Sequence, residues 1–205
     1  HFIGFDHVPE TLLQWRAIPE TYLAVASNGK IFRDPLGAMT RFRNGLLAYY
    51  PEDIRKKKIA ARCMSIGQAG QYNHVRCAQR EDWVAFQLNE SRFISDVISL
   101  AYLLNKAYKP FYKWMHRGLK DLPILGETLY RLISEVVDLN GRDARREEKI
   151  RQKFEVMSRI CRHLVLSLTT QGLSDSTSPF LVDHGPQVQS RIEDTQIRSM
   201  DVWSE

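Results

Sequence analysis

Apolar side chains recur at helical spacing through the long segments of this chain. Between about residues 71 and 108, five apolar residues lie at i, i+4, i+7, i+8 and i+11 and therefore share one helical face: Phe93, Val97, Leu100, Ala101 and Leu104. We expect this segment to be the central helix and Pro110 to end it, because proline cannot continue a helix. Steps of four and three mark a last long helix over about residues 143–171, with the stripe Ile150, Phe154, Met157, Cys161, Leu164 and Leu168.

Three Pro-Glu pairs predict where helices begin in the first half of the chain: Pro9-Glu10, Pro19-Glu20 and Pro51-Glu52. Proline at the first helical position lacks only an N–H that would be unpaired anyway, and an acidic first turn suits the helix dipole. With the stop signal Asn28-Gly29, the pairs predict helices over residues 9–17, 19–27 and 52–68, and a further helix is expected over 36–49.

The remaining elements are shorter. Gly67 and Gly70 predict a break or kink before the central helix. Aromatic residues predict a short helix over 111–115, and further helices are expected over 125–136, stopping near Asn140-Gly141, and near 187–193. At most one two-stranded element is expected, near residues 2–6 and 30–33.

These elements predict an all-α fold, an antiparallel bundle of long helices with shorter helices packed at one end. We divide the chain into three parts: residues 1–50 with short helices and a connecting segment, residues 51–172 as the bundle core, and residues 173–205 as a polar tail with a short helix.

Composition narrows the class of protein. The 205 residues are 43% hydrophobic and 26% charged, which is ordinary globular composition and excludes wholesale disorder. The net charge of +5 tolerates an anionic partner without requiring one. The sparse cysteines Cys63, Cys77 and Cys161 lack metal or disulfide spacing, and the longest apolar stretch, around residues 98–104, is too short for a membrane span. We therefore expect a cytoplasmic protein without membrane contact, and, because the chain opens without Met, one with sequence missing upstream.

Motifs that carry chemistry are mostly absent. There is no phosphate-binding glycine loop, no nucleophile elbow and no histidine pair at metal-ligand spacing. Arg159 precedes His163 by four residues, one short of the Arg–His spacing of one class of helical ribonuclease. The Gly-Ser turn and Asp-x-Asp clamp with which nucleotidyltransferases hold Mg²⁺ against phosphates are also absent. We therefore expect no metal site and no catalysis by this chain alone.

Two charged features invite opposite interpretations. Arg55-Lys56-Lys57-Lys58 with Arg62 is a basic helical cluster, interpreted first as a solvated face and second as a surface for an anionic partner. Arg92 and Asp96 are four residues apart on one helix, which predicts a structural ion pair or, alternatively, a buried functional carboxylate.

Aromatic residues at the predicted helix break are the third feature. Tyr108, Tyr112 and Trp114 could form a stacking wall there, with Lys113 reaching a phosphate. The alternative is that the rings cap the core. The candidate substrate-binding residues are therefore Arg92, Asp96, Tyr108, Tyr112, Lys113 and Trp114.

The run from Arg92 to Trp114, with the pattern R-x3-D-x3-[LM]-A-[FY]-L-L-x3-Y-x-P-[FY]-x-K-W, resembles an uncharacterised helical family, domain of unknown function 4037. The segments Trp15–Glu20, Gly29–Asp34 and Tyr50–Asp53 resemble the same family. Its members commonly follow an N-terminal nucleotidyltransferase domain. The resemblance implies a fold like the C-terminal helical domain of kanamycin-type nucleotidyltransferases.

By this resemblance, the chain is the acceptor-binding or lid domain of a nucleotidyltransferase-like enzyme. Its partners would be the upstream catalytic domain and a small-molecule or protein acceptor. A nucleoside triphosphate and Mg²⁺ are expected only with that catalytic domain, and no cofactor in this chain. The alternatives are a non-catalytic, antitoxin-like interaction module and, with less support, an RNA-binding or RNA-cleaving helical domain.

Overall fold

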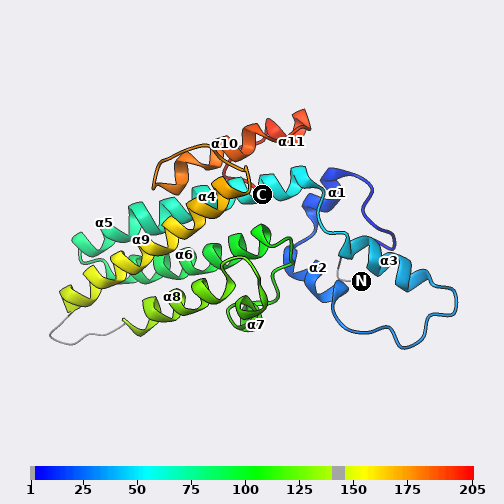
Figure 1. Cartoon of the computed structure of the whole chain (residues 1–205), viewed down its shortest axis with the longest axis horizontal. Helices are drawn as coiled ribbons and strands as arrows, with labels where there is room; N and C mark the ends of the chain where they lie inside the picture. The colour runs from blue at the N-terminus through cyan, green and yellow to red at the C-terminus, as the bar shows by residue number, and fades with distance from the viewer. Residues whose placement is uncertain (1–2, 140–145) are drawn as a thin grey trace.

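A computed structural model describes residues 3–139 and 146–205, and all regular structure in those two ranges is helical, without a strand (Figure 1). The all-α class is thereby confirmed. The α-helices are α1 Leu12–Ala17, α2 Glu20–Ser27, α3 Ala38–Leu47, α4 Glu52–Ile66, α5 His74–Gln79, α6 Trp83–Leu104, α7 Tyr112–Met115, α8 Gly126–Asp138, α9 Arg146–Thr170, α10 Gly185–Ser190 and α11 Thr195–Arg198. A π-helix, η1 (Gly67–Asn73), and 3₁₀ turns η2 (Arg117–Asp121) and η3 (Leu181–Asp183) complete them.

Helix α4 lies at the centre of the packing. It contacts α6 along one side and α10, α11 and η3 along another, while α1 to α3 gather near its N-terminal end (Figure 1). Its apolar residues Ile54, Ile59, Cys63 and Ile66 are at most 1% exposed. Burying an isoleucine side chain contributes about 1.5–3 kcal/mol, so this surface supplies much of the stability of the core.

The predicted break at the two glycines is instead a continuous passage from α4 through the π-helix η1 into α5. The glycines are needed for close packing. A Cβ on Gly70 would lie 2.1 Å from Cδ2 of Phe93, and one on Gly67 would lie 2.7 Å from Cγ2 of Val182. The extra residue of the π turn thus accommodates two close contacts without ending the helix.

The prediction of one central helix over residues 71–108, ended by Pro110, is wrong in two respects: the segment is divided, and its last helix ends earlier. Glu81 adopts a positive φ of 56°, and the Asp82 side chain accepts the N–H of Ala85, so the segment divides into α5 and α6. Helix α6 ends at Leu104, before Lys106 with its φ of 51°, and not at Pro110. The apolar face from Phe93 to Leu104 is buried as expected.

Most other predicted helices are confirmed with shifted ends. Helix α1 begins after Thr11, whose side chain forms a capping box with Gln14, and not at Pro9. Helices α2 and α4 begin directly after Pro19 and Pro51. The predicted stop near 140–141 and the first residues of the 143–171 helix lie outside the described residues.

The basic cluster is not a solvated face, which corrects the first interpretation. Arg55, Lys57 and Lys58 are at most 4% exposed. Arg55 bonds to Leu103 O and Gln171. Lys57 and Lys58 are covered by residues 173–205, which pack against α4 through Leu181, Val188, Ile192 and Ile197, each at most 1% exposed. A sequence segment that reads as a polar tail is therefore packed onto the central helix.

A buried charge cluster joins α5, α6 and α9. Lys153 Nζ lies 2.5 Å from Glu90 Oε2, and His74 Nε2 lies 3.5 Å from the same oxygen. Burial raises the pKa of Glu90, but hydrogen bonds and charge from His74 and Lys153 outweigh it and hold the pKa below its ordinary value. Burial also lowers the pKa of His74, so the cluster is a lysine–carboxylate pair beside a neutral imidazole.

Candidate functional site

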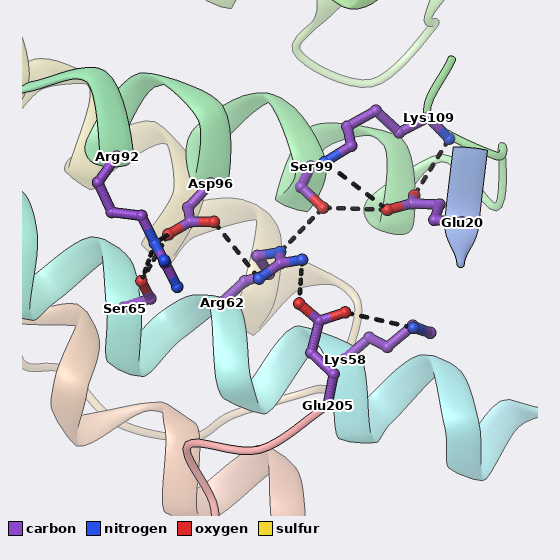
Figure 2. A network of polar contacts seen from close by, with 9 residues as sticks. All are labelled: Glu20, Lys58, Arg62, Ser65, Arg92, Asp96, Ser99, Lys109 and Glu205. Carbon is purple, nitrogen blue, oxygen red and sulfur yellow. Dashed lines mark hydrogen bonds and ion pairs between the residues drawn. The ribbon is translucent and has the colours of Figure 1, made fainter. Parts of the chain in front are cut away.

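Arg62 is the centre of a polar network between α4 and α6 (Figure 2). Its Nη1 lies 3.3 Å from Asp96 Oδ1, and its Nε donates a 2.9 Å hydrogen bond to Ser99 Oγ. Its Nη2 pairs with the Glu205 carboxylate. One guanidinium, with a side chain only 12% exposed, therefore holds two carboxylates and a hydroxyl in fixed positions.

Asp96 is a buried carboxylate shared among several donors. Its Oδ2 accepts a 2.5 Å hydrogen bond from Ser65 Oγ and a 2.6 Å bond from Nε of Arg92. The Asp96 side chain is 6% exposed, whereas that of Arg92 is 62% exposed. The i,i+4 pair thus forms as predicted, and its carboxylate also belongs to the network.

Glu20, at the first position of α2, brings a second buried carboxylate from a distant part of the chain. Its Oε2 accepts from Ser99 Oγ at 3.2 Å, and its Oε1 accepts from the backbone N–H of Lys109 at 3.1 Å. The Lys109 ammonium lies 4.0 Å from the same carboxylate (Figure 2). Pro19 sets the start of α2, and the start of α2 places Glu20 against α6.

Glu205 completes the network from the opposite side. Its Oε2 accepts from Lys58 Nζ at 3.3 Å, and its Oε1 pairs with Arg62. Burial raises the pKa of this carboxyl, but the charges of Arg62 and Lys58 outweigh burial, so the pKa lies below its ordinary value. Glu205 is therefore ionised at neutral pH and bridges two cations.

The arrangement offers carboxylates and cations side by side in a sheltered place. Such a site can accept hydrogen bonds from hydroxyl or amine groups and can also hold an anionic group. No three His, Cys, Asp or Glu residues of the described ranges gather as a metal-binding group would require. Among the same residues, no helix combines the length and the apolarity needed to cross a bilayer.

In the described ranges, no hydrogen bond, ion pair or ring contact joins the other predicted site residues to Arg92 or Asp96, although Tyr108 directly precedes Lys109 of the network. Tyr108 packs against Tyr49 and Tyr50, with ring centroids 4.8 Å and 5.1 Å away, and donates a 2.8 Å hydrogen bond to Leu46 O. Burial raises the pKa of its phenol. In this structure Tyr108 ties the end of α6 to α3.

Tyr112, Lys113 and Trp114 are exposed on the short helix α7, which contacts η2. Among the described residues, no hydrogen bond, ion pair or ring contact joins them to Arg92 or Asp96. The structure therefore brings together only two of the six predicted residues, and the binding role of the α7 residues stays a prediction.

Sequence reasoning missed Glu20, Ser99 and Glu205. Its sequence pattern marks Glu20 only as a helix start, and its partner Ser99 lies 79 positions away along the chain. A buried polar residue within an apolar helical face was a usable signal for Ser99, which is 0% exposed. No local pattern points to Glu205.

A second polar surface lies between α8 and α9. Arg131, Arg159 and His163 line a small pocket there together with Glu135. Arg159 Nη1 lies 3.4 Å from Glu135 Oε2, so its charge is already paired. The arginine and the histidine do share a pocket, as the RNA-cleaving alternative requires.

The comparisons with known proteins agree with the sequence resemblance. A family model described as Domain of unknown function (DUF4037) matches residues 15–115. No curated protein and no solved structure matches the chain.

Proposed function

Because this chain belongs over residues 15–115 to the DUF4037 family, we propose that it is the acceptor-binding domain of a nucleotidyltransferase-like enzyme. In this proposal the network around Arg62 binds the acceptor, and the catalytic domain is supplied by other sequence. The long helices would form an antiparallel bundle comparable to the helical domain of kanamycin-type enzymes, in a cytoplasmic transferase.

One observation carries the proposal: two buried carboxylates from separate helices are linked to one arginine, Asp96 directly and Glu20 through Ser99. Glu20, Asp96 and Arg62 all lie within the family-matched segment, although they come from α2, α6 and α4. Burying charges this way stabilises a fold less than apolar packing would, so a network of this kind is more readily explained by ligand binding.

The chemistry of acceptor binding follows from the donors and acceptors present. An acceptor hydroxyl or amine would donate to Glu20 and Asp96, while Arg62 and Ser99 keep both carboxylates oriented. The nucleoside triphosphate and Mg²⁺ would be held by the catalytic domain. In a two-domain enzyme the acceptor would lie in the cleft between the domains, where ligand sites are common.

The test is ligand-induced stabilisation of the purified chain. A panel of aminoglycosides, amino alcohols, sugars and nucleosides is added before thermal denaturation. We expect at least one class to raise the melting temperature, since ligand at a hundred times Kd contributes about 2.7 kcal/mol. Glu20→Gln should abolish the shift, and Glu127→Gln, which changes an exposed carboxylate, should keep it. No stabilisation by any class, or equal stabilisation of Glu20→Gln, contradicts the proposal.

The interaction-module alternative keeps one specific observation in its favour. Phe32 is 94% exposed and Leu36 is 82% exposed in the segment between α2 and α3. Exposed large apolar side chains that lie close together mark contact surfaces in many proteins. The basic cluster counts against the RNA-binding alternative, because Arg55 and Lys57 are buried and bonded to oxygens of the fold itself, so the cluster does not form an open basic surface along a phosphate backbone.

A further inference from the structure

Lys58 and Arg62 are two cations one helical turn apart on α4, and both are nearly buried. Their side chains are 5% and 12% exposed. Arg62 has Asp96 as a second carboxylate, but among the described residues the only carboxylate within ion-pair distance of Lys58 is that of Glu205. Without an anion here, the buried Lys58 ammonium would keep the face of the Tyr50 ring, 5.3 Å from its Nζ, but no opposite charge, which is strongly unfavourable.

Glu205 is held differently from the cations that it joins. Its side chain is 36% exposed. The hydrogen bonds of the two preceding residues are local, from Trp203 N to Asp201 Oδ1 and from Ser204 N and Oγ to Asp201 O. The Glu205 carboxylate, which Figure 2 shows between Lys58 and Arg62, is thus the main polar contact of residues 203–205 outside their own turn. Since α11 ends at Arg198, exchange of that carboxylate for another anion would break no helix.

We propose that Lys58 and Arg62 form a binding site for an anionic oxygen group, a phosphate or a carboxylate, which Glu205 fills in this structure and from which a ligand displaces it. The site lies beside Ser99, Asp96 and Glu20, so the anion would extend from a molecule that also offers hydroxyl or amine groups. The inference rests on the proposed function, because it names ligand chemistry for the same site.

The chemistry of the two cations suits this role. An arginine fork binds two oxygens of a phosphate or carboxylate, and a lysine adds a mobile point charge. Glu205 already uses one oxygen for each cation. A tetrahedral phosphate reproduces both contacts with two of its oxygens and leaves the others toward solvent.

The test measures binding of inorganic phosphate and, separately, of acetate to the purified chain by isothermal titration calorimetry. Glu205→Gln keeps the side-chain volume but removes the competing charge. We expect it to bind one of the two anions at least tenfold more tightly than the original chain does. Tighter binding of phosphate assigns a phosphorylated ligand, and tighter binding of acetate assigns a carboxylate ligand. Glu193→Gln removes an equal charge from an exposed position nearby and should bind like the original chain.

The cations are tested in the Glu205→Gln background. Adding Lys58→Met should lower anion affinity at least tenfold, whereas Arg33→Ala, at an exposed arginine, should not. Circular dichroism verifies that each variant is folded, and Arg62→Gln replaces Lys58→Met if the latter unfolds. Equal anion affinity of Glu205→Gln and the original chain, or binding that persists after loss of the cations, overturns the inference. Anion binding involves no acceptor and no transfer, so its failure is distinguishable from failure of the proposed function.

Discussion

Lys57 is a buried lysine bonded to neutral oxygens. Its Nζ donates to Gln189 Oε1 at 2.8 Å and to the carbonyl oxygen of Asp201 at 2.6 Å, and the residue is 1% exposed. Burial, helped by the nearby charge of Arg16 and opposed by Asp201, lowers the pKa of Lys57 to about 8. Lys57 thus anchors residues 189–201 to α4, and the free energy needed to bury its charge depends on pH.

The contribution of Lys57 to stability should therefore rise with pH in one window. The folded chain releases this proton near pH 8, whereas the unfolded chain keeps it up to about 10.5, so between these values the unfolded state binds more protons. Burial raises the pKa of the Cys63 and Cys161 thiols, which adds an opposite trend that every variant shares. Urea unfolding across this window should therefore show the free energy of unfolding of the original chain, and of Lys30→Met at an exposed lysine, rising relative to that of Lys57→Met. The same pH dependence in Lys57→Met and the original chain would contradict the prediction.

For individual side chains, the sequence predicts those contacts that follow from a short, regular spacing along a helix. Arg92 and Asp96 pair because residues four apart share a helical face. The partners of Glu20 and Glu205 lie 79 and more than 140 residues away along the chain, and no spacing rule encodes such contacts. The candidate site was therefore found in part, through Arg92 and Asp96, and the remainder required the tertiary structure.

Among the helices, the junction of α4 and α5 depends on a glycine. Gly70→Ala would place a methyl group against the fully buried ring of Phe93. Overpacking of this kind costs typically 1–3 kcal/mol, which chemical denaturation can measure. Phe93→Leu should relieve part of the clash, so the double variant should lose less stability than the sum of the single variants. Strict additivity would contradict the close approach.

The connection of α9 to α5 and α6 depends on Lys153. Lys153→Ala leaves Glu90 buried beside a neutral His74, and losing one partner of a buried pair costs roughly 3–5 kcal/mol. Lys149→Ala, one turn earlier on α9 and less buried, provides the comparison in the same unfolding experiment. A loss no larger than that of Lys149→Ala would contradict a structural role for the cluster.

Helices were predicted correctly where the spacing of apolar residues determines them. The prediction failed where contacts between distant segments determine the local structure. The apolar stripes gave α6 and α9, but two glycines that usually end a helix instead permit a π turn against Phe93 and Val182. Four consecutive basic residues predict an exposed face, but the residues that bond to them, Leu103, Gln171 and residues 189–205, lie far along the chain.

For the whole molecule, we predict that the 205-residue chain alone transfers no nucleotide. Its sequence lacks the Gly-Ser turn and the Asp-x-Asp clamp that position Mg²⁺ against the phosphates. Incubation with labelled ATP, Mg²⁺ and candidate acceptors should leave the label on the nucleotide. Label that reaches an acceptor, with an activity that follows the chain through purification, would show that this prediction is wrong.

The central claim is that the network around Arg62 holds the acceptor for a nucleotidyl transfer. The most direct measurement is transfer of labelled nucleotide by the complete gene product that contains this chain, with Asp96→Asn compared with Asp175→Asn, which changes an exposed carboxylate. Ser99→Ala serves as a second network variant that keeps every charge. The account predicts that Asp96→Asn and Ser99→Ala each lower transfer at least tenfold while the protein remains folded, and that Asp175→Asn leaves it unchanged. Absence of any transfer by the complete product, or full transfer by folded Asp96→Asn protein, would contradict the claim.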